Sequence, residues 1–235
     1  RIAAIGEAEE NPIAREEEIV VSYVEKVVEF NLINLAEVNQ RDGLSVFCGV
    51  DPSRMTEREM LQEAEARLRT GASGIFISPT NSGIDGKDRG YQALFDYCQD
   101  VGAPILCAPP VYEATGDSTL GRAIQFGWTI RDFPRSRVIF AALGWVPELA
   151  DNGERDLLEA IGRLPDVCVD LALSLSQGAP HKKSSKELAA LISRIGAERV
   201  LFATGSPFVD PKSAVQGFWD IPLPDLDRIL IGKEN

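Results

Sequence analysis

The chain has 235 residues, 44% of them hydrophobic and 26% charged, which excludes disordered and collagen-like classes of protein. Its 24 basic and 36 acidic residues give a formal net charge of −12, and this argues against nucleic acid and anionic membrane surfaces as partners. A membrane span needs about 18 apolar residues, and no apolar run approaches that length. The first residues lack the pattern of a signal peptide, so we expect a cytoplasmic protein.

Expected strands and helices alternate along the chain. Short apolar runs predict seven strands, at residues 1–6, 44–50, 72–78, 103–107, 137–142, 167–173 and 200–203. Apolar residues at helical spacing predict helices at residues 12–40, 57–70, 91–101, 120–132, 154–164 and 184–195. Because the strands are continuously apolar, the pattern predicts a parallel sheet covered by helices. No linker rich in Pro, Gly or Ser divides the chain, so we expect one domain over residues 1–235.

Candidate catalytic residues lie near the carboxyl ends of these strands, where α/β folds place their ligand sites. Asp51 follows one predicted strand, and Asp170 lies inside another, where a carboxylate must be paired or protonated. His181 is the only histidine and titrates near neutral pH, which suits a general base or a substrate contact. The alternatives are structural aspartates and an exposed loop histidine.

Hydroxyl and amide side chains also gather at the predicted strand ends. The candidate ligand-binding residues are Ser78, Thr80, Asn81, Trp145, Ser174, Thr204 and Ser206. Such a mouth is suited to binding a small polar ligand without a metal. The alternative is that the hydroxyl groups only satisfy backbone groups in the connecting turns.

Several segments from about Phe47 onward, taken in order, resemble the amidohydrolase-related proteins of the metal-dependent hydrolase superfamily. The segments and the family patterns they are similar to are residues 48–52 (GVDP), 102–106 (GLPVLIH), 133–144 (FPxLKIVLAHLGG), 164–170 (YPNVYVD), 198–204 (ERILFGTDYP) and 227–232 (KILGGNA). The resemblance implies a (β/α)8 barrel of the TIM type. Its first strand is expected to precede Arg1, so that residues 1–6 correspond to the second strand.

The same resemblance implies a metal centre whose ligand positions have changed. Family members are expected to hold one divalent metal, often zinc or manganese, through an H-x-H pair on the first strand, one His on each of the fifth and sixth strands, and an Asp on the eighth. The last three positions fall on Ala108, Ala142 and Gly205, which carry no ligating atom. The H-x-H pair would precede Arg1. We therefore expect a vacated metal site, no metal ligands and no cofactor.

Three hypotheses of function follow. The first is a pseudoenzyme, a barrel that binds a small polar molecule or a protein partner, or serves as a regulatory subunit, in a homo- or hetero-oligomer. The second is a hydrolase or decarboxylase of the superfamily that acts on a small polar substrate through an unorthodox site of Asp51, Asp170 and His181. The third is an incomplete or altered version of an active hydrolase.

Overall fold

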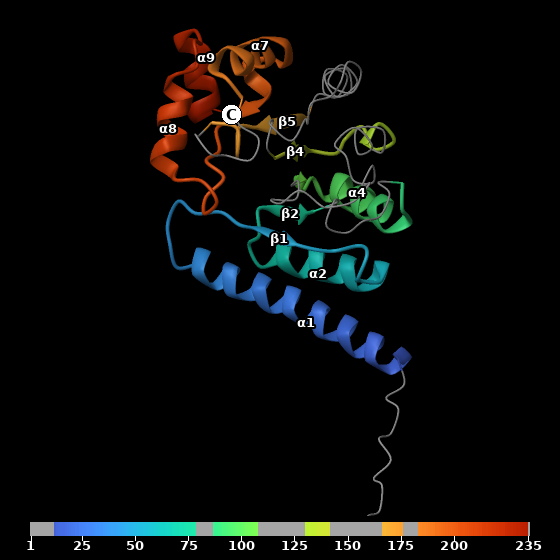
Figure 1. The fold of residues 1–235 in the computed structure, drawn as a ribbon. Coiled ribbons are helices and arrows are strands. Elements are labelled where there is room, and N and C mark those ends of the chain that lie inside the picture. Colours follow the sequence, from blue (N-terminus) through green and yellow to red (C-terminus); the bar gives the residue numbers. More distant parts are fainter. Residues whose placement is uncertain (1–11, 79–86, 108–129, 142–165, 176–182, 235) are drawn as a thin grey trace, which may run out of the picture.

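The computed structural model describes residues 12–78, 87–107, 130–141, 166–175 and 183–234, with the backbone alone for residues 12–22. Within these residues, six strands form one sheet, and each strand pairs in parallel with the next one along the chain (Figure 1). The strands are β1 (Phe47–Gly49), β2 (Gly74–Ile77), β3 (Ile105–Cys107), β4 (Val138–Phe140), β5 (Val167–Asp170) and β6 (Val200–Leu201).

The sheet confirms six of the seven predicted strands, and the seventh, at residues 1–6, lies outside the described residues. The strands are shorter than the apolar runs that predicted them, because hydrogen bonding between neighbours ends before the apolar character does. A parallel sheet with sequential strand order is the arrangement of a (β/α) barrel. The described strands form an open sheet, with β1 and β6 at its two ends.

Helices connect and cover the strands. They are α1 (Pro12–Val38), α2 (Glu57–Arg69), α4 (Arg89–Val101), α7 (Ser185–Ile195), α8 (Pro211–Trp219) and α9 (Asp225–Ile229), with a 3-10 turn at Ala197–Arg199 and a π-helical turn at Leu230–Glu234. In Figure 1, α1 and α2 lie at one end of the sheet, and α7, α8 and α9 lie at the other. No helix among the described residues is long and apolar enough to cross a membrane.

Local sequence signals explain where the helices begin. Capping boxes start α2 at Thr56 and α7 at Ser184, in each case with a glutamate three residues later that reaches back to the capping residue. Asp210 caps α8, which also has Pro211 in its first turn. The predicted helix at 154–164 lies outside the described residues, and the one at 120–132 is described only from Ile130.

The core lies between the sheet and its helices. Its largest fully buried side chains include Met60 of α2, Phe95 of α4 and Ile75 of β2. A second, smaller cluster joins α1 to β1 through Leu35, Cys48 and Ala72. This cluster anchors the C-terminal half of α1 beside the first described strand.

Candidate functional site at the carboxyl ends of the strands

One face of α1 runs beside β1 and forms a wall of the candidate site. Tyr23, Val27, Asn31 and Leu35 are spaced four residues apart, so their side chains lie on the same side of the helix. Leu35 packs in the cluster with Cys48, which lies at the centre of β1. The other three side chains therefore follow β1 toward its carboxyl end.

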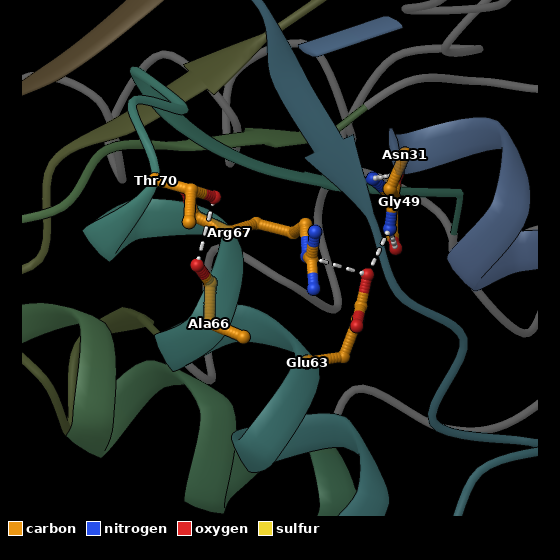
Figure 2. Close-up of polar contacts among 6 residues, drawn as sticks. All are labelled: Asn31, Gly49, Glu63, Ala66, Arg67 and Thr70. Atoms are coloured by element: carbon orange, nitrogen blue, oxygen red, sulfur yellow. Dashed lines mark hydrogen bonds and ion pairs between the residues drawn. The ribbon is translucent and has the colours of Figure 1, made fainter. Parts of the chain in front are cut away.

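Asn31 binds both backbone polar groups of Gly49 (Figure 2). The side-chain Nδ2 donates to the Gly49 carbonyl at 2.9 Å, and the Gly49 N–H donates to Oδ1 at 2.8 Å. The next residue, Val50, turns the other way and donates to Phe76 O of the neighbouring strand at 3.1 Å. Asn31 therefore occupies the place that the peptide of another strand would take beside β1.

A buried ion pair supports Asn31 from behind (Figure 2). Asn31 Nδ2 also donates to Glu63 Oε1 at 3.0 Å, and Arg67 Nε lies 3.1 Å from the same oxygen. The Arg67 N–H is not directed at that oxygen well enough to make a hydrogen bond, so their attraction is mainly between the charges. The side chains of Glu63 and Arg67 are only 7% and 13% exposed, which makes the pair a buried one.

A hollow of about 210 Å³ opens where α1 meets the carboxyl ends of β1 and β2. Its lining residues are Tyr23, Val27, Gly49, Val50, Asp51, Phe76 and Ser78. Of the predicted site residues, the structure thus brings together Asp51 and Ser78. Tyr23 was missed as a site residue, since the sequence places it only among the apolar positions of a long helix.

The Asp51 carboxylate is held by the turn that follows β1. Its Oδ1 accepts hydrogen bonds from Ser53 N at 3.0 Å and Ser53 Oγ at 2.6 Å, and its Oδ2 accepts one from the Tyr23 hydroxyl at 3.0 Å. The Arg54 guanidinium lies 4.8 Å from the centre of the Tyr23 ring, as a cation–π contact. Burial, and then the negative charge of Asp51, raise the pKa of Tyr23, so the phenol remains a hydrogen-bond donor further into the alkaline range than an ordinary tyrosine.

The ends of β5 and β6 hold a second group of predicted residues, whose side chains brace the turns. Asp170 is 8% exposed and accepts a hydrogen bond from Ala172 N at 2.9 Å, while the buried Ser174 hydroxyl donates to Ala172 O at 3.2 Å. Thr204 Oγ1 accepts a hydrogen bond from Ser206 N at 3.2 Å. In these contacts the side chains bond to backbone groups of the turns, which is the alternative to ligand binding described above. The contacts do not test whether these residues also bind a ligand.

Gly205 and Leu173 pack against each other between these two strand ends. Gly205 has φ +75°, and a Cβ built on it would lie 2.7 Å from Leu173 Cδ2 and 3.0 Å from Leu173 N. Leu173 itself has φ +61°, a left-handed conformation that is uncommon for residues other than glycine. The space that a side chain at position 205 would enter is therefore filled by Leu173.

Of the three ligand positions that the resemblance implies within the chain, only position 205 lies among the described residues. The described residues contain no group of three or more His, Cys, Asp or Glu side chains placed to hold a metal ion. Gly205 offers no ligating atom, and Leu173 fills the space beside it. Ala108 and Ala142 lie outside the described residues, as do Thr80, Asn81, Trp145 and His181.

A separate groove lies between α7 and α8. It measures about 580 Å³ and is lined by Leu175, Lys183, Ser184, Ser185, Leu188, Ser213, Gln216, Gly217 and Asp220. Several of its polar side chains already bond within their own helices or caps, as Ser213 does with Asp210 and Gln216 with Asp220. This groove was not predicted from the sequence, because its lining combines residues of two helices and of the segments beside them.

Comparison with solved structures identifies the fold as a TIM-type barrel. An uncharacterised TIM-barrel protein from Bordetella bronchiseptica superposes with a TM-score of 0.71 at 19% identity, covering 87% of this chain and 69% of its own. A 2,6-dihydroxybenzoate decarboxylase from Rhizobium gives 0.69 at 16% identity, covering 92% and 76%. The 5-carboxyvanillate decarboxylase LigW from Sphingomonas paucimobilis gives 0.65 at 13% identity, covering 89% and 70%.

The family follows from the sequence comparison. The model of the amidohydrolase family matches residues 9–235, so the chain belongs to the amidohydrolase family. The resemblance seen in the ordered motifs is thereby confirmed. No curated protein matches the chain significantly.

Proposed function

We propose that this chain is a ligand-binding member of the amidohydrolase family that works without the family's metal centre. Its ligand is a small polar molecule bound at the carboxyl ends of the strands, with the hollow beside Tyr23 and Asp51 as the binding site. The observation that carries the proposal is the packing of Leu173 against Gly205.

The packing matters because of what position 205 corresponds to. By the motif resemblance, Gly205 stands where the eighth strand of a family member would provide its metal-binding carboxylate. A longer side chain there would meet Leu173 Cδ2 and the Leu173 backbone, and the φ of +75° disfavours any residue with a Cβ. The alanines at positions 108 and 142 point the same way, since neither has a ligating atom.

The hollow at β1 and β2 supports the binding part of the proposal. It lies at the carboxyl edge of a parallel sheet, the edge where barrels bind their ligands. It combines an apolar lining with three convergent polar groups, those of Tyr23, Asp51 and Ser78.

The test is metal loading combined with turnover. The protein is dialysed against zinc and manganese salts in turn, desalted, and its bound metal is measured per chain, alongside an assay against amide, ester and aromatic carboxylate substrates. We expect less than stoichiometric metal and no turnover above the uncatalysed rate. One metal per chain, with turnover that a chelator removes, would overturn the proposal.

A hydrolase or decarboxylase with an unorthodox site is the second candidate. It is favoured by the structural neighbours, several of which are decarboxylases, and by the positions of Asp51 and Asp170 at strand ends. This candidate predicts that Asp170→Asn and His181→Ala abolish any turnover that is found, whereas Asp42→Asn, at an exposed aspartate outside the site, leaves it unchanged. Unchanged rates in Asp170→Asn would remove that residue from the mechanism.

The proposal also includes the location of the protein, its partner and its oligomeric state. A cytoplasmic location, a protein partner and a homo- or hetero-oligomeric state are predictions from the sequence. Molar mass measured by light scattering, with and without added cell extract, tests the last two.

A further inference from the structure

Among the described residues, the lining of the hollow holds one formally charged side chain, that of Asp51. The Tyr23 phenol beside it is uncharged at neutral pH, and the Arg54 guanidinium, which is not part of the lining, lies over the Tyr23 ring. The chain as a whole has a net charge of −12. A carboxylate that entered the hollow would lose its hydration close to a like charge, which is unfavourable.

The rest of the lining is apolar and partly aromatic. Val27, Val50 and Phe76 supply hydrocarbon surface, and the Tyr23 ring lies among them. The Arg54 guanidinium already lies over the Tyr23 ring, so the ring offers a ligand apolar surface and not a further cation–π contact. An apolar body with a cationic head directed at Asp51 would match this lining.

The volume of the hollow indicates the size of the group that it can hold. A water molecule takes about 30 Å³ in the liquid, so 210 Å³ corresponds to about seven water molecules. A single ring or a short branched chain with one polar head is of that size.

We infer that the ligand of this hollow is a small organic cation, a primary ammonium on an apolar or aromatic body, with the ammonium directed at Asp51. The inference rests on the proposed function for the location of the binding site, and it adds the sign of the charge. It separates this chain from the structural neighbours whose named substrates are benzoates, which are anions.

The experiment uses probes of equal shape and different charge on the full chain. Binding of benzylamine, benzyl alcohol and benzoate to the unmodified protein is measured by titration calorimetry and by ligand-observed NMR. We expect benzylamine to bind and benzoate to bind at least about 10-fold more weakly, which is the discrimination that one charge-assisted hydrogen bond gives. The benzyl alcohol should lie between them.

Two variants assign the effect to Asp51. Asp51→Asn keeps an oxygen for the Ser53 N–H and should weaken benzylamine binding by about 10-fold or more, with little effect on benzyl alcohol. Asp42→Asn removes an exposed carboxylate outside the hollow and should leave all three affinities unchanged. Thermal unfolding of both variants confirms that they are folded.

Three results would overturn the inference. They are benzoate binding as tightly as benzylamine, benzylamine binding that Asp51→Asn does not weaken, and no benzylamine binding at concentrations up to the millimolar range. The first result removes only the charge assignment, because the hollow would still bind a ligand. Failure of the proposed function is seen separately, as stoichiometric metal with chelator-sensitive turnover.

Discussion

The two ends of the described sheet are built in different ways. At β1, a buried polar network of side chains holds α1 against the strand, and a hollow remains at the strand end. At β6, two residues with left-handed backbone conformations pack against each other, and the corner between them is closed. A site supported by side chains leaves room for a ligand, whereas one closed by the backbone does not.

The largest expected effect comes from the buried ion pair behind Asn31. Glu63→Ala leaves Arg67 buried without its partner and removes one of the two acceptors of Asn31 Nδ2, so it should lower the free energy of unfolding by about 3–5 kcal/mol. Urea denaturation measures this. The control is Glu65→Ala on the same helix, whose side chain is 55% exposed and pairs with Arg69 at 3.6 Å; its cost should be below about 1 kcal/mol. Equal costs would mean that burial of the network does not matter.

Asn31→Asp tests the contact with β1 directly. The change replaces the Nδ2 donor by an oxygen that faces two acceptors, Gly49 O and Glu63 Oε1, so we expect a loss of about 2–3 kcal/mol in the free energy of unfolding. Hydrogen exchange at the Gly49 amide should accelerate in parallel. Asn34→Asp, at an exposed position on α1, should have little effect on either measurement. Unaltered exchange at Gly49 would contradict the role assigned to Asn31.

Gly205→Ala tests the closed corner. The new Cβ would meet Leu173 and would have to adopt φ +75°, so we expect a loss of about 2 kcal/mol in the free energy of unfolding. Gly43→Ala is a matched control, since Gly43 has φ +79° but nothing within 4 Å of its Cβ, and it should lose only about 1 kcal/mol. The difference between the two variants measures the contact with Leu173. No difference would show that the corner has room for a side chain.

The smallest effect concerns Tyr23 and pH. Since its pKa is raised in the folded state by burial and by Asp51, folding is favoured below the ordinary pKa of 10.0, and this contribution is lost as the pH rises through the folded-state value. Comparison of the unmodified protein with Tyr23→Phe in alkaline unfolding should reveal this extra loss in the unmodified protein alone. Asp51→Asn should lower the pKa of Tyr23 in an ultraviolet titration, because the charge and the acceptor are weakened while burial remains. A pKa that Asp51→Asn leaves unchanged would contradict the hydrogen bond.

The strand pattern was predictable from sequence because each buried parallel strand is a short, continuous apolar run between turn residues. The helix α8 was not predicted, although Asp210-Pro211 is a recognisable helix start; it has nine residues, and only Ala214 and Phe218 are buried. The family could be recognised from ordered motifs such as that around Gly205. The contacts that the side chains near those motifs make could not be predicted from the motifs.

The contacts that define the candidate site depend on distance in space. Asn31 and Gly49 are 18 residues apart, and Tyr23 and Asp51 are 28 apart, so no local pattern pairs them. The sequence marks Tyr23 and Asn31 only as members of one helix face. Likewise, the sequence shows that position 205 is a glycine but cannot show that Leu173 fills the space beside it.

The carboxamide of Asn31 also has a consequence for the behaviour of the protein at high concentration. An end strand with unpaired N–H and C=O groups is a template on which another chain can add a strand, and such edges lead to aggregation. Among the described residues β1 is such an end strand, and Asn31 occupies one pair of these groups on it and keeps α1 alongside. Within the described sheet, the side chain that holds α1 in place therefore also covers a point at which another chain could add a strand.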